Sequence, residues 1–167
     1  MCKILISGYY GFGNAGDEAL LSSILQALLE LEPKAEITVI SGNPSETMST
    51  HKVKAIGRFD MWKIYQAVYS CDMLISGGGS LLQDVTSARS LYYYLSIIAL
   101  ANTLGKRVMI YAQGIGPLRK SLARSTVGRV LNQVSMITVR DYASKEELRS
   151  LGIHHVPITV TADAVLG

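Results

Sequence analysis

Short apolar runs alternate with longer segments of helical periodicity along this chain. Seven runs are interpreted as strands: Lys3–Ser7, Glu36–Ser41, Val53–Ile56, Met73–Ile75, Val108–Ala112, Met136–Val139 and Ile158–Thr161. Six segments between them are interpreted as helices: Asp17–Leu31, Ser45–Thr50, Met61–Tyr69, Ser90–Leu104, Leu118–Val134, and one that starts at a Ser144–Glu147 capping box and ends near Leu151. This alternation predicts an α/β fold with a doubly wound, mostly parallel, Rossmann-like sheet.

Three glycine-rich turns directly follow predicted strands. They are segments 8–16 (GYYGFGNAG), 77–80 (GGGS) and 114–117 (GIGP). In parallel sheets the loops after the strands gather at one edge, and ligands bind where the strand order reverses. Glycine lets backbone amides approach an anion, and the following helix start adds partial positive charge. The sequence therefore predicts an anion-binding edge whose crevice lies between the first and fourth strands.

Length and composition fit one domain with a core on both faces of a sheet. The chain has 167 residues, of which 49% are apolar and 17% charged. No apolar run has the length that spans a bilayer, and the first residues do not resemble an export leader. Cys2 and Cys71 lie beside predicted strands, which is typical of reduced core thiols. We therefore expect a cytoplasmic protein.

Charge is distributed unevenly along the chain. The net charge is +3, and no acidic residue lies between Asp84 and Asp141. The basic residues inside this block are Arg89, Lys106, Arg107, Arg119, Lys120, Arg124, Arg129 and Arg140. The block favours an anionic partner such as phosphate, carboxylate or lipid, and the alternative is a solvated face balanced by acids elsewhere. We expect no nucleic-acid partner, because no zinc-finger spacing or RNP-like motif accompanies the block.

The first glycine turn contains the pattern G-x-G-x-x-G from Gly11 to Gly16. The pattern does not favour NAD, because residues 8–10 separate it from the strand and no acidic residue ends the second predicted strand. We therefore expect no cofactor. Asn14 can hydrogen-bond a substrate hydroxyl, and Asp17 either takes part in the chemistry or caps the following helix.

Other polar positions at the same predicted edge have two interpretations each. The turn at 77–80 either cradles a phosphate or lets a helix pack close to the sheet. Arg140 suits a carboxylate or phosphate, or else pairs with Asp141 to fix the loop. Asp163 follows the last predicted strand, where it has either a site role or a place in a turn. The three histidines show no metal-ligand spacing, so we expect no metal site.

Five segments, in order along the whole chain, carry a family resemblance. They are 8–20 (GYYGFGNAGDEAL), 76–84 (SGGGSLLQD), 112–117 (AQGIGP), 139–144 (VRDYAS) and 161–163 (TAD). Together they resemble the polysaccharide pyruvyl transferases, especially the bacterial cell-surface type. That family resembles glycosyltransferases with two Rossmann-like domains, the GT-B architecture. The resemblance implies that residues 1–167 are one N-terminal domain and that a second, C-terminal domain is absent from this chain.

The resemblance also implies an activity and its partners. Members transfer pyruvate from phosphoenolpyruvate to a sugar as a ketal. In the cell-surface type the acceptor is an N-acetylmannosamine residue on a lipid-diphosphate-linked precursor of a secondary cell-wall polymer, and the ketal anchors surface-layer proteins. Such an acceptor implies a location at the inner face of the membrane. Peripheral membrane contact and a homo-oligomer are left open.

Site roles follow from the resemblance position by position. Asp17 and Arg140 are the catalytic candidates: Asp17 orients or deprotonates a sugar hydroxyl, and Arg140 holds a carboxylate or the leaving phosphate. The substrate-binding candidates are Gly13, Asn14, Gly16, Gly77, Gly78, Gly79, Ser80, Gln113, Gly114 and Asp141.

Most groups that bind phosphoenolpyruvate are expected in the missing half, so we expect the fragment alone to be inactive. Two alternatives stay open. One is half of a nucleotide-sugar glycosyltransferase. The other is a non-catalytic domain that binds anionic glycans or lipids through Arg119–Arg129.

Overall fold

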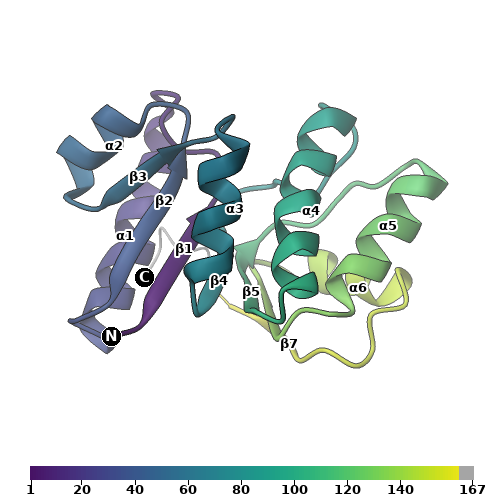
Figure 1. Ribbon diagram of the computed structural model, residues 1–167. Coiled ribbons are helices and arrows are strands. Elements are labelled where there is room, and N and C mark those ends of the chain that lie inside the picture. Colours follow the sequence, from purple (N-terminus) through teal and green to yellow (C-terminus); the bar gives the residue numbers. More distant parts are fainter. Residues whose placement is uncertain (162–167) are drawn as a thin grey trace.

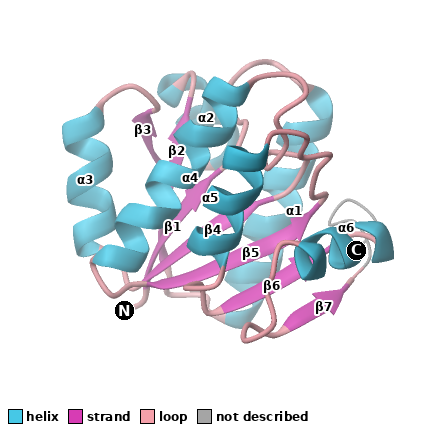
Figure 2. Cartoon of the chain, turned by 90° about the vertical axis from the view of Figure 1, so that its right-hand side faces the viewer, coloured by secondary structure: helices cyan, strands magenta, loops and turns pink. Residues whose placement is uncertain are grey.

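The computed structural model describes residues 1–161 as a parallel sheet between two layers of helices (Figures 1 and 2). In chain order the elements are β1 (Lys3–Ser7), α1 (Ala15–Leu31), β2 (Glu36–Ser41), α2 (Pro44–His51), β3 (Lys54–Gly57), α3 (Met61–Ser70), β4 (Met73–Gly77), α4 (Ala88–Thr103), β5 (Arg107–Gln113), α5 (Ser121–Leu131), β6 (Met136–Val139), α6 (Tyr142–Ser150) and β7 (Ile158–Val160). The predicted site position Asp163 lies outside the described residues.

The strand order is β3-β2-β1-β4-β5-β6-β7, and every described pair is parallel. The direction of winding reverses between β1 and β4, which confirms the doubly wound prediction. Ser7 pairs with Ser76 at the carboxyl ends of these two strands. The glycine turns that follow β1 and β4 therefore begin side by side, as the sequence predicts.

Both faces of the sheet are buried, because successive residues of a strand point into two different hydrophobic cores. In β1, Leu5 belongs to one hydrophobic cluster, whereas Ile4 and Ile6 belong to the other. The Leu5 cluster takes its helical members from α3, α4, α5 and α6, and the second takes Leu21, Ile24 and Leu25 from α1. The helix α1 thus covers one face of the sheet, and α3 to α6 cover the other. The carboxyl ends of the strands stay uncovered by these helices.

Two predicted helix starts are wrong, and tertiary contacts explain both. The predicted capping box at 144–147 is not used: Asp141 caps α6, its Oδ1 accepting from the Ser144 amide at 2.7 Å. The Ser144 hydroxyl instead accepts from the Ile115 amide at 2.9 Å. The helix predicted from Leu118 begins at Ser121, because the Asp84 carboxylate holds the preceding segment through the amides of residues 119 and 120.

Candidate functional site

The first glycine turn ends in a helix cap. The Asn14 Oδ1 accepts from the amides of Gly16 at 3.0 Å and Asp17 at 3.3 Å, so Asn14 is the residue that caps α1. Asp17 is therefore not the cap. The Asp17 carboxylate lies in the first turn of α1, at the edge of the sheet, and is available for other partners. Gly13 lies at the open tip of the turn with φ of 72°, where an added Cβ would meet nothing within 4 Å.

Tyr10 fastens the first glycine turn to the second. Its ring is buried, and its Oη donates to the Gly77 carbonyl at 2.8 Å. Burial, with further contributions from Asp17, Tyr94 and Glu18, raises the pKa of Tyr10, so the phenol stays protonated and donates. A Cβ on Gly77 would lie 2.8 Å from Ile24 Cδ1 and 3.0 Å from Tyr10 Oη, which explains the glycine there.

Replacing Tyr10 with phenylalanine is expected to lower the free energy of unfolding by roughly 1–3 kcal/mol, because the buried Gly77 carbonyl loses its donor. Urea unfolding followed by circular dichroism measures the change. Tyr9→Phe is the matched control, since Tyr9 is the exposed neighbour in the same turn. Equal stability of the Tyr10 and Tyr9 variants would show that the hydrogen bond contributes nothing.

The second and third glycine turns are also joined through their backbones. The Gly78 amide donates to the Tyr111 carbonyl at 2.9 Å, and the Gly114 amide donates to the Gly79 carbonyl at 2.8 Å. Gly78 and Gly79 have φ of 69° and 67°, a conformation that favours glycine. The amides of Gly78 and Gly114 thus hold the turns against each other.

Asp17 faces the second turn across the crevice. A Cβ on Gly79 would lie 3.5 Å from Asp17 Oδ1, so the carboxylate sits directly over this glycine. Burial raises the pKa of Asp17, and the neighbouring Glu18 raises it further. A carboxylate with a raised pKa is a stronger base than an ordinary aspartate, which suits it to accept a proton from a hydroxyl.

A cavity of about 320 Å³ opens beside Asp17. Its lining is rich in hydroxyl and amide groups, from Tyr9, Ser80, Gln83, Thr86, Ser90 and Tyr94. Such groups can hydrogen-bond a polar ligand from several sides. The volume and the lining fit a sugar-sized group next to the Asp17 carboxylate.

Arg140 reaches the same crevice from the end of β6. Its Nη2 donates to Ser80 Oγ at 3.1 Å, and its Nε lies 3.5 Å from Asp141 Oδ2. The guanidinium occupies the space above Gly114, where a Cβ would lie 2.7 Å from Cζ. Ser80 therefore links the Asp17 cavity to a second cavity of about 290 Å³, which Arg140 lines together with the third turn.

The remaining predicted residues mainly support this arrangement. The Asp141 carboxylate caps α6 and pairs with Arg140; the pKa of Asp141 is lowered first by its bonds to Ser144 and then by Arg140. Gln113 is fully buried, and its Nε2 donates to the Ser76 carbonyl at 2.9 Å and the Ser76 hydroxyl at 2.8 Å. Gln113 therefore holds β4 and β5 together beneath the turns.

Sequence reasoning missed a second arginine at this edge. Arg58 directly follows β3, and its guanidinium carbon lies 5.0, 5.0 and 4.7 Å from the ring centroids of Phe12, Phe59 and Tyr93. Phe12 belongs to the first glycine turn and stacks on Tyr9 at 4.2 Å. The position of Arg58 just after a strand was the available signal, but its aromatic partners come from three separate segments.

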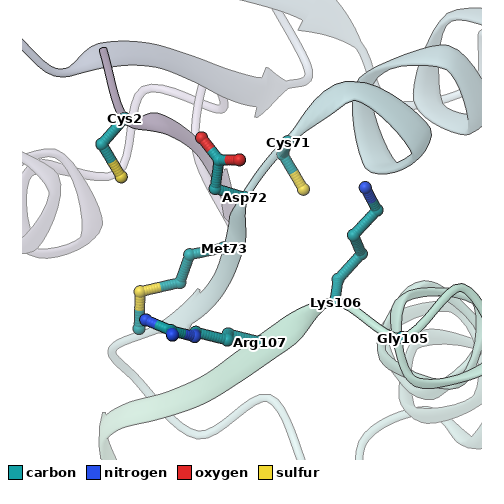
Figure 3. Close-up of a pocket in the computed structure, with 7 residues that line it drawn as sticks. All are labelled: Cys2, Cys71, Asp72, Met73, Gly105, Lys106 and Arg107. Atoms are coloured by element: carbon teal, nitrogen blue, oxygen red, sulfur yellow. The ribbon is translucent and has the colours of Figure 1, made fainter.

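Another cavity, of about 480 Å³, lies at the opposite edge of the sheet (Figure 3). It is lined by residues at the beginnings of β1, β4 and β5: Cys2, Cys71, Asp72, Met73, Gly105, Lys106 and Arg107. Burial raises the pKa of the Cys71 thiol, which disfavours the reactive thiolate. Among residues 1–161, no glycine-turn residue and no predicted site residue lines this cavity.

A sequence model of one family matches residues 14–167, which is nearly the whole chain and includes every predicted site residue except Gly13. The chain belongs to the polysaccharide pyruvyl transferase family. The crevice at β1, β4 and β6 holds Asp17, Ser80 and Arg140 together with the two cavities that they line.

The solved structures that share the fold include one from Anabaena and one from Listeria monocytogenes. Anabaena HepE, whose crystal structure holds UDP and glucose, is 12% identical, with a TM-score of 0.61 over 98% of this chain and 44% of its own. A protein described as a UDP-N-acetylglucosamine 2-epimerase, from Listeria monocytogenes, is 13% identical, with a TM-score of 0.62 over 98% of this chain and 45% of its own. The chain thus spans less than half the length of these structures. Comparison with curated protein sequences gives no match.

Proposed function

We propose that this pyruvyl transferase family member moves pyruvate from phosphoenolpyruvate to a sugar on a lipid-diphosphate carrier, forming a ketal. The single observation that carries the proposal is the meeting of Asp17, Ser80 and Arg140 at one crevice, with a carboxylate on one side and a guanidinium on the other. Besides a proton source for the methylene carbon of the donor, this transfer needs a base for a hydroxyl and a cation for an acidic donor, and these last two are the functions that the crevice offers.

The proposed reaction balances without a cofactor. A proton adds to the methylene carbon of phosphoenolpyruvate, and C2 gains cationic character. One sugar hydroxyl attacks C2 and loses its proton to Asp17. A second hydroxyl then attacks the same carbon and expels phosphate, which leaves a cyclic ketal that carries the pyruvate carboxylate. Of the two hydroxyl protons, one replaces that consumed at the methylene carbon, and the other leaves with phosphate.

The chain supplies the acceptor side in this proposal. The cavity of about 320 Å³ is lined by Asp17, Leu81 and several neutral hydroxyl and amide groups, with no cation among them, which suits a sugar better than a trianion. Arg140, at the boundary between the two cavities, would hold the pyruvate carboxylate or the leaving phosphate. Because the related structures are about twice as long, we propose that further donor-binding groups lie outside these 167 residues.

The test measures phosphate release from phosphoenolpyruvate by a catalytically active form of the protein, with and without lipid-diphosphate-linked sugars. We expect release that depends on the acceptor, and a product whose mass is that of the sugar plus a pyruvate ketal. Release of a nucleoside diphosphate from a nucleotide sugar instead would favour the glycosyltransferase alternative. Binding of the lipid-linked sugar with turnover of neither donor would favour a non-catalytic domain.

A further inference from the structure

Three aromatic rings lie exposed in a row on α3. Trp62, Tyr65 and Tyr69 are 67%, 40% and 63% exposed, and we call them the aromatic stripe. The ring centroids of Trp62 and Tyr65 are 5.9 Å apart, and those of Tyr65 and Tyr69 are 6.3 Å apart, with nearly parallel planes. A continuous exposed aromatic surface of this kind marks an interaction site.

The stripe is not part of the core. On the opposite face of α3, Ile64 and Val68 are buried against the sheet, which satisfies the packing of this helix. Figure 2 shows α3 at the margin of the molecule, with no other described helix outside it. Phe59 and Met61, 79% and 56% exposed, extend the apolar surface at the beginning of α3.

The helices beside the aromatic stripe carry basic side chains but no acidic ones. The helices α3, α4 and α5 stand next to one another (Figure 1) and contain no Asp or Glu, whereas α1 alone contains three. Exposed cations of this layer include Arg89 and Arg129, whereas Lys63 pairs with Asp60. At the far end of the layer, α6 carries Glu146 and Glu147, and each of these pairs with an arginine.

A basic group also borders the stripe directly. Lys106 Nζ lies 5.7 Å from the centroid of the Tyr69 ring, and Figure 3 shows this side chain extending beside Cys71, the residue that follows α3. The nearest acids in the sequence, Asp60 and Asp72, are both engaged. Asp60 pairs with Lys63 at 3.2 Å, and Asp72 accepts from the Lys3 amide at 2.8 Å.

We propose that the aromatic stripe docks on an anionic membrane surface. Tryptophan and tyrosine are the side chains that favour the membrane–water interface, where the ring contacts acyl chains and the polar atom stays hydrated. The acid-free layer with its lysines and arginines complements anionic headgroups. No helix in residues 1–161 is long and apolar enough to cross a bilayer, so the contact is peripheral. The inference does not depend on the transfer reaction.

The experiment uses Trp62 as its own probe, because it is the single tryptophan of the chain. The protein is mixed with vesicles of phosphatidylcholine, with or without phosphatidylglycerol. We expect the fluorescence of Trp62 to shift to the blue and to be quenched by brominated acyl chains only when phosphatidylglycerol is present. Added salt should weaken both effects. An unchanged spectrum with anionic vesicles overturns the proposal, as does a blue shift that depends on protein concentration alone, which indicates a second copy.

Variants distinguish binding through the aromatic stripe from general electrostatic attraction to the vesicles. Tyr65→Ala with Tyr69→Ala keeps the probe and should lower partition onto anionic vesicles by about tenfold. Tyr142→Ala, which removes a 74% exposed ring from α6, is the matched control and should bind as the original chain does. Circular dichroism checks that each variant folds. Unchanged flotation of the stripe variant overturns the proposal. Because no phosphoenolpyruvate or sugar is present, this failure would leave the proposed reaction untouched.

Discussion

Replacing Asp17 with asparagine is expected to lower kcat for pyruvate transfer by about a hundredfold or more, because the sugar hydroxyl loses its proton acceptor. The amide keeps the size of the side chain above Gly79, so the fold should be retained. The measurement is acceptor-dependent phosphate release by a catalytically active form of the protein. Glu30→Gln is the matched control: Glu30 lies on the same helix but is exposed, and its carboxylate accepts a hydrogen bond from Gln26.

The pH dependence provides a second, independent check on Asp17. A base acts when it is deprotonated, so activity falls as pH drops through its pKa. Burial and Glu18 raise the pKa of Asp17, so this acid limb should lie above the range of an ordinary aspartate. The residual activity of Asp17→Asn should lack the limb. A limb that persists unchanged in the variant would exclude Asp17 as the base.

Replacing Arg140 with alanine is expected to lower kcat/KM for phosphoenolpyruvate by roughly a hundredfold, the size of effect seen when one charge-stabilising donor is removed. Arg140→Lys keeps the charge but loses the planar fork, so its activity should be intermediate. Arg149→Ala serves as the control, because it removes an exposed arginine of helix α6 that pairs with Glu146.

Steady-state kinetics distinguish the two roles proposed for Arg140. If it holds the donor carboxylate equally in the ground and transition states, the alanine variant raises KM and leaves kcat unchanged. If it stabilises the departing phosphate, kcat falls and KM changes little. Wild-type kcat and KM in the alanine variant would remove Arg140 from the site.

The sequence was sufficient for the order of elements and for the edge where the glycine turns meet. Each turn follows a run of buried strand residues, and parallel strands put their carboxyl ends together whatever the details of packing. Sequence reasoning could thus expect the turns after β1 and β4 to face each other across one crevice, and the Tyr10–Gly77 hydrogen bond joins them there.

The helix caps could not be chosen from the sequence alone. Asn14 and Asp17 are both good capping residues, and so are Asp141 and Ser144. The structure decides between them by what else each side chain contacts: Ser144 Oγ is taken by the Ile115 amide, which leaves the cap to Asp141. The caps matter because they determine which carboxylates stay available for chemistry.

The cluster around Arg58 and the aromatic stripe were beyond sequence reasoning for a related cause. The three rings around Arg58 come from the β1–α1 turn, the β3–α3 loop and α4, so only the folded chain brings them together. Helical periodicity predicted α3, but a face that carries Trp62, Tyr65 and Tyr69 is as apolar as a core face. Which face is buried depends on the neighbours.

Gly114 is not demanded by the conformation of its own main chain, since it is not among the residues with positive φ. It is demanded by Arg140, whose guanidinium fills the volume that any larger residue would need. Positions 114 and 140 are therefore coupled. A methyl group added at Gly114 would displace the Arg140 guanidinium without changing the net charge of the protein. In the sequence this glycine resembles a phosphate-loop residue, but in the structure its missing side chain makes room for the arginine.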